Sequence, residues 1–130
     1  MVKMKRKEPI VLYEGIKYIV ECAIRMSGSS ESEDFLDSMT VPDRAKIMKL
    51  IKRLANVGRI YNKEQFEKIE GKIWQFKHYQ TRILMYYLAG QRFALTHGYY
   101  KKGKRTPKPE IERANQIMNE YDEIRKGMEL

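Results

Sequence analysis

The sequence has very little cysteine. Its one thiol, Cys22, permits no disulfide within the chain, which excludes a disulfide-stapled scaffold and fits a reducing cytoplasm. Cys22 lies in an apolar stretch, where a free cysteine behaves as a small hydrophobic residue. We therefore expect a buried structural thiol rather than a nucleophile.

Long hydrophobic runs are also missing. No uninterrupted apolar run approaches the roughly 18 residues that are needed to span a bilayer. The N-terminal stretch MVKMKRKEPIVLYEGIKYIV starts like a secretory signal, but Glu14, Lys17 and Glu21 interrupt its apolar part and no small-residue cleavage site follows. The sequence thus predicts a soluble, cytoplasmic protein without a membrane partner.

Motifs for metals and common cofactors are absent from the sequence as well. The two histidines, His78 and His97, and the distant cysteine have no spacing that is typical of metal ligands. There is no glycine-rich phosphate loop, no nucleophile elbow and no helical zinc motif. We expect neither a metal nor a cofactor.

Acidic residues are missing from the whole interval between Glu70 and Glu110. The chain has 26 Lys and Arg against 17 Asp and Glu, and nine of the basic residues fall in this interval, so that one contiguous third of the chain accounts for the formal charge of +9. Segregated charge of this kind suits a polyanionic partner, and a solvated basic face without a partner is the alternative. The nine are Lys72, Lys77, Arg82, Arg92, Lys101, Lys102, Lys104, Arg105 and Lys108.

The first half of the chain predicts two strands followed by two helices. β-Branched and aromatic residues predict a strand at about 16–25 and a less distinct one at 10–14, with Gly15 at a turn or bulge. The serine-rich turn SGSSESED supplies N-cap residues for a short helix. A longer helix follows in VPDRAKIMKLIKRLANVG, with Pro42 in its first turn and Gly58 at its end.

The second half predicts an antiparallel meander and a C-terminal helix. The runs KIWQFKHY, RILMYYLA and RFALTHGY are three closely spaced strands, with Gly90 and Gln91 at a tight turn. Helical spacing returns over 107–126, where Thr106 suits the N-cap and Pro107 the first helical position. We expect a single α+β domain over residues 1–130, in the order β-α-α-β-β-β-α, with helices on one face of a small sheet and the other face open.

Strand alternation brings basic residues onto the open face. If Trp74, Phe76, Ile83 and Met85 point to the helices, Lys77 and Arg82 lie opposite each other on the exposed face. Cations contact phosphates and aromatic rings stack on unpaired bases, so this face predicts single-stranded RNA as the partner. The other contributors expected at this face are Tyr86, Tyr99, Tyr100, Lys101, Lys102, Lys104, Arg105 and Lys108, with one of the adjacent tyrosines buried and one available.

Either histidine could act as a general acid or base near neutral pH. His78 lies on a turn, where a structural role is favoured. His97 lies at a strand end beside the basic loop, and catalytic and structural roles are equally supported by the sequence.

Four segments of the chain are similar to a known family. They are DRAKIMKLIKRLANVGR, FEKIEGKIWQFK, RILMYY and LTHGYYKKGKRTPKPEIERA, of which the last is the most specific. Residues 30–122 resemble the RelE/HigB-type toxins of the RelE/ParE toxin–antitoxin superfamily, especially its phage-derived branch. Residues 1–15 are an additional N-terminal segment, and Gln75 stands where this branch commonly has Glu.

The resemblance implies a metal-independent endonuclease that cuts mRNA on the ribosome and is restrained by an antitoxin, a small helix-turn-helix protein. In such enzymes the ribose 2′-hydroxyl attacks the adjacent phosphate and leaves a cyclic phosphate. By position, Arg82 matches the arginine at the scissile phosphate, Lys77 a basic residue of the preceding strand, and Lys101 and Lys102 the basic pair at the last strand end. His97 is the first candidate for the general base and Lys77 the second.

Other functions fit the sequence less well. A non-catalytic superfamily member that poisons DNA gyrase, or an inactive phage-derived relative, would have little need for four cations on one surface. A basic DNA-binding accessory protein is the weakest alternative, because no helix-turn-helix pattern with a basic recognition helix is present.

Overall fold

A six-stranded sheet forms the centre of the computed structural model, which describes residues 8–128. Its spatial order is β1-β2-β6-β5-β4-β3, and β2 pairs parallel to β6 while the other neighbours are antiparallel. The strands are β1 (Ile10–Glu14), β2 (Ile19–Cys22), β3 (Phe66–Glu70), β4 (Ile73–His78), β5 (Thr81–Leu88) and β6 (Arg92–Tyr100). The α+β class and the antiparallel β4-β5-β6 meander are confirmed.

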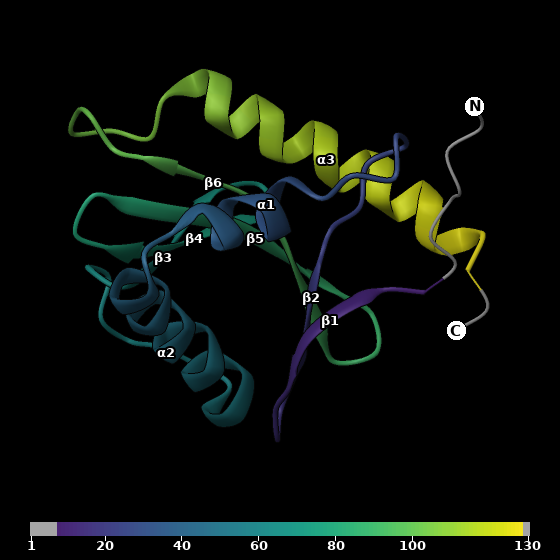
Figure 1. Cartoon of the computed structure of the whole chain (residues 1–130), viewed down its shortest axis with the longest axis horizontal. Coiled ribbons are helices and arrows are strands. Elements are labelled where there is room, and N and C mark those ends of the chain that lie inside the picture. The colour runs from purple at the N-terminus through teal and green to yellow at the C-terminus, as the bar shows by residue number, and fades with distance from the viewer. Residues whose placement is uncertain (1–7, 129–130) are drawn as a thin grey trace.

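Helices cover both faces of this sheet. α1 (Glu31–Ser38) and α2 (Val41–Val57) pack on one face, and α3 (Lys108–Lys126) runs along the other (Figure 1). The expectation that all helices share one face is therefore wrong. The meander has apolar side chains on both faces, including Leu84 and Tyr86 on the second, and the apolar stripe of α3 buries them.

The helix ends follow the sequence signals closely. The Ser30 hydroxyl accepts a hydrogen bond from the Glu33 amide, and Thr40 likewise accepts from Asp43. Gly58 ends α2 in the left-handed conformation at φ 91°, and its amide donates to the Leu54 carbonyl. α3 begins at Lys108, one residue later than expected, with Pro107 as its N-cap and no side-chain hydrogen bond from that cap residue.

Two features of the strands differ from the prediction. The strand expected at 16–25 is limited to β2, because the chain turns after Gly15, where an added Cβ would lie 2.5 Å from the Ala55 carbonyl oxygen. β3 was not predicted at all, since FEKIE is mostly charged and offers few apolar residues to a pattern search. It pairs with β4 as the far edge of the sheet.

Each face of the sheet has its own core. The first core joins α1 and α2 to the side chains of Phe76, Ile83 and Met85. The second core lies under α3 around Leu84 and Tyr86. The side chains of the meander therefore alternate between the two faces of the sheet in the register that the sequence predicted.

The cysteine is part of the first core. The Cys22 side chain is fully buried, and burial raises the pKa of its thiol to about 12. A thiol held protonated in this way is a poor nucleophile, which confirms the structural role expected for Cys22.

Candidate functional site

A basic pocket occupies the end of the second face that α3 leaves uncovered. It has a volume of about 370 Å³ and lies between strands β3 to β6, the loop of residues 101–107 and the first turn of α3. The residues that line it are Glu67, Lys68, Ile69, Gln75, Lys77, Arg82, Tyr99, Lys101, Lys104, Arg105, Thr106 and Ile111. We call this hollow the basic pocket.

Arg82 lies in the floor of the basic pocket. The β4–β5 register places it opposite Lys77, and the β5–β6 register places it opposite Tyr99. Its Nη1 donates to the carbonyl oxygens of Tyr79, at 2.6 Å, and Thr81, at 2.9 Å, which fixes the guanidinium. Burial lowers the pKa of Arg82, and the side chain is only 8% exposed, so its charge is poorly hydrated and an anion would be bound with little loss of water.

Lys77 has an acidic partner from the edge strand. Its Nζ lies 2.8 Å from Oε1 of Glu67, which sits on β3 opposite Gln75. The acid-free interval of the sequence is therefore not acid-free in space. The sequence did not predict Glu67 at this site because it did not predict β3. Once FEKIE is known to be a strand, its alternation places Glu67 on this face.

A chain of hydrogen bonds ties the basic loop to the sheet. The Tyr99 hydroxyl donates to Gln75 Oε1 at 3.1 Å, and Gln75 Nε2 donates to the Thr106 hydroxyl at 3.4 Å. Burial raises the pKa of Tyr99, so its phenol stays protonated. These contacts fix the two ends of residues 101–107 relative to Arg82, because Tyr99 precedes the loop and Thr106 closes it.

The structure brings together six of the residues that the sequence placed at the site. Lys77, Arg82 and Lys101 line the basic pocket, as do Tyr99, Lys104 and Arg105. Lys102 and Lys108 are exposed and do not line it.

His97 is not placed to act on a substrate in the basic pocket. It is 2% exposed beneath α3, and its Nδ1 lies 3.2 Å from the Thr96 hydroxyl. Its Nε2 lies 3.3 Å from Oε1 of Glu110 but without hydrogen-bond geometry. Burial lowers the pKa of His97, only partly opposed by Glu110. The structure therefore does not bring His97 to the basic pocket, because α3 covers the imidazole.

Two of the aromatic residues expected at the site do not line the basic pocket. Tyr86 is 2% exposed, and its hydroxyl donates to Asp122 of α3 at 3.2 Å. Tyr100 is 51% exposed, but it packs beside Phe35 of α1, on the opposite face from Arg82. Tyr99 is half-buried and lines the basic pocket, whereas the exposed Tyr100 does not line it.

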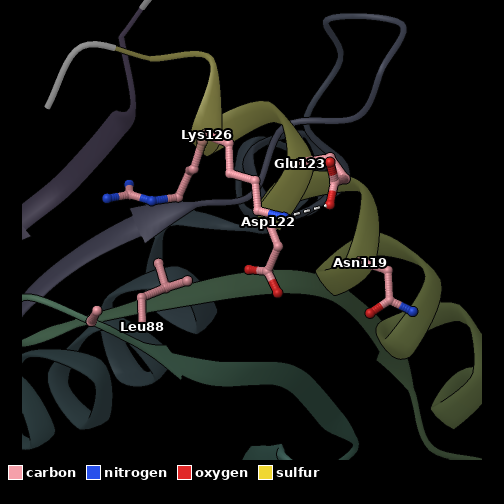
Figure 2. Close-up of a pocket in the computed structure, with 7 residues that line it drawn as sticks. Leu88, Asn119, Asp122, Glu123 and Lys126 are labelled. Carbon is pink, nitrogen blue, oxygen red and sulfur yellow. Dashed lines mark hydrogen bonds and ion pairs between the residues drawn. The ribbon is translucent and has the colours of Figure 1, made fainter.

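A second, wider hollow has a different character. It measures about 630 Å³ and lies between the C-terminal half of α3 and the end of β5. Figure 2 shows Asp122 and Glu123 among its lining residues, with Glu123 paired to Lys126 at 2.9 Å. Charges of both signs line this hollow, so it offers no uniform field to an anion.

Two further properties concern the described part of the chain. Among residues 8–128, no group of three or more His, Cys, Asp and Glu side chains could hold a metal ion. No helix within that range is long and apolar enough to cross a membrane.

The chain matches a family model along about two thirds of its length. The model is described as Phage derived protein Gp49-like (DUF891), and the match covers residues 34–119. These residues include the last part of α1, all of α2, the strands β3 to β6 and most of α3, and thus the whole basic pocket. No match was found among curated proteins.

Proposed function

The chain belongs to the phage-derived Gp49-like family, a toxin-type family related to RelE-like toxins, and we propose that it is the toxin of a toxin–antitoxin pair that cleaves mRNA. The observation that carries this proposal is the basic pocket. Cations from β4, β5 and the loop after β6 meet there beside one aromatic ring. A solvated basic face would not require a buried guanidinium at its centre.

The chemistry needs these cations because no metal is invoked. When the ribose 2′-oxygen attacks the adjacent phosphate, the pentacoordinate phosphorane gains negative charge. Arg82 and Lys101 are the groups we assign to that charge, with Arg82 held in place by two backbone carbonyls. One fixed donor of this kind lowers the activation barrier by about 3 kcal/mol.

Single-stranded RNA fits the basic pocket better than a duplex does. The pocket is a hollow enclosed by a loop and the sheet, and Tyr99 offers a ring on which an extruded base could stack. We further propose that the message is cut on the ribosome, and that a small antitoxin restrains the activity by covering the basic pocket.

The test is cleavage of a defined message by the purified protein, with and without ribosomes. We expect discrete cuts whose upstream fragments end in a 2′,3′-cyclic phosphate. Intact RNA in both reactions would contradict the nuclease assignment. If growth arrest then occurred with DNA damage, a gyrase poison would be the better description.

A further inference from the structure

Few groups in the basic pocket can accept the proton of the attacking 2′-hydroxyl. Lys68, Lys101, Lys104 and Arg105 are cations, and Gln75 and Thr106 carry no basic group. The first two candidates from the sequence also fail. His97 lies beneath α3, outside the pocket, and the Nζ of Lys77 is engaged in an ion pair with Glu67.

One carboxylate remains. Of the described residues that line the basic pocket, Glu67 alone carries one. Its side chain is 37% exposed, so an incoming hydroxyl can reach it, and the contact of Lys77 Nζ is to its Oε1. A carboxylate has acceptor sites on both oxygens, so the ion pair leaves room for another donor.

The geometry of the strands sets Glu67 near the phosphate site. Glu67 on β3 is opposite Gln75 on β4, and Lys77 on β4 is opposite Arg82 on β5. Glu67 and Arg82 therefore lie on either side of Lys77, on one face of three neighbouring strands. A carboxylate placed near a phosphate-binding cation can take the proton of the attacking hydroxyl while the cation holds the phosphate.

We propose that Glu67 is the general base of the cleavage, with Lys77 as the residue that positions it; this rests on the nuclease function proposed above. The 2′-hydroxyl gives its proton to the Glu67 carboxylate, and its oxygen forms a bond to phosphorus. The bond from phosphorus to the 5′-oxygen breaks, and the departing oxygen takes a proton from water. Glu67 then returns its proton to solvent.

The experiment compares Glu67→Gln with the wild type in single-turnover cleavage of the same message. The amide still accepts a hydrogen bond from Lys77 but cannot take up a proton, so we expect a loss of at least about 100-fold in rate. The acid limb of the pH–rate profile should disappear with it. Glu70→Gln, an exposed carboxylate of the same strand, is the matched control and should cut as the wild type does.

A second variant separates a base from a merely structural carboxylate. Glu67→Ala should lose activity and recover part of it in added formate, whereas Arg82→Ala should not recover. Full-rate cleavage by Glu67→Gln with an unchanged pH profile would overturn the base assignment while the nuclease function stands. A wild-type protein that leaves RNA intact would overturn both.

Discussion

At the scale of single residues, the site depends on charges that the fold partly removes from water. Arg82 sits in the sheet with its guanidinium fixed by carbonyl oxygens. His97 is buried, and its Nε2 makes no hydrogen bond within the described residues. The two residues lie on the same face, yet one opens to the basic pocket and the other is sealed by α3.

Arg82→Ala should abolish most of the cleavage and growth arrest while the protein remains folded. Removal of one fixed donor to the phosphorane corresponds to a loss of roughly 100-fold in rate. Arg53→Ala removes an exposed arginine from α2, on the other face, and is the control. Growth arrest at full strength in Arg82→Ala would refute the phosphate contact.

His97 should make the stability of the protein fall in mild acid. Burial lowers the pKa of His97 from its ordinary 6.5, and Glu110 opposes this while Arg113 adds to it. Below pH 6.5 the imidazole of the unfolded chain takes up a proton that the imidazole of the folded chain does not. The neutral imidazole therefore contributes its full stability above about pH 6.5, and this contribution is lost as the pH falls.

Urea unfolding of His97→Gln at pH 5.5 and 7.5 checks this linkage. The variant should lose less stability between the two pH values than the wild type does, and His78→Gln should behave like the wild type. An equal loss in His97→Gln and wild type would show that other groups carry the pH dependence.

At the scale of elements, the two helical layers are fixed to the sheet by different means. α3 is held by charge pairs as well as by its apolar stripe. The fully buried Glu21 of β2 accepts hydrogen bonds from Arg125 and Tyr121 of α3 and from Arg92 of β6. α1 instead approaches β6 so closely that only a residue without a side chain fits beneath it.

That close approach occurs at Gly98. An added Cβ would lie 2.3 Å from Cδ2 of Phe35, so Gly98→Ala must displace the ring and should destabilise the fold by about 1–3 kcal/mol. Gly103→Ala is the matched control, because nothing lies within 4 Å of its added Cβ. Urea unfolding would measure both, and equal stability of the two variants would contradict the packing of α1 on β6.

At the scale of the whole molecule, the fold concentrates the excess charge in one hollow. Six Lys and Arg residues line the basic pocket against a single carboxylate among its described lining residues. The α2 surface also carries exposed lysines, but they follow a convex helix on the other face of the sheet. A field focused in a hollow attracts a polyanion more strongly than the same charge spread over a convex surface.

The salt dependence of RNA binding should therefore report on the pocket. Replacement of both Lys104 and Arg105 by Ala removes two phosphate contacts, and should reduce the slope of log affinity against log salt by about 1.4 for a single strand. A 2′-deoxy oligonucleotide that cannot be cut suits the titration. The double variant Lys46→Ala and Lys49→Ala, on α2, should leave the slope unchanged. A reduced slope in this α2 variant and an unchanged slope in the pocket variant would show that RNA binds the α2 surface instead.

The local elements of this protein could be predicted from its sequence because their signals are local. Caps at Ser30 and Gly58, the helical period of α2 and the alternation of β4 and β5 all act within a few residues. The same alternation placed Lys77 opposite Arg82. β3 could not be predicted in this way, because a charged edge strand is stabilised by its partner strand rather than by its own composition.

What the sequence by itself determined was the excess of positive charge, the order of most elements and the cross-strand pair of Lys77 and Arg82. The tertiary structure alone decided which groups share the pocket with them. It brought in Glu67 from an unrecognised strand and buried His97 and Tyr86 beneath α3. Such contacts depend on which face of the sheet a distant helix covers, and that choice follows from the burial of two separate apolar surfaces rather than from any local pattern.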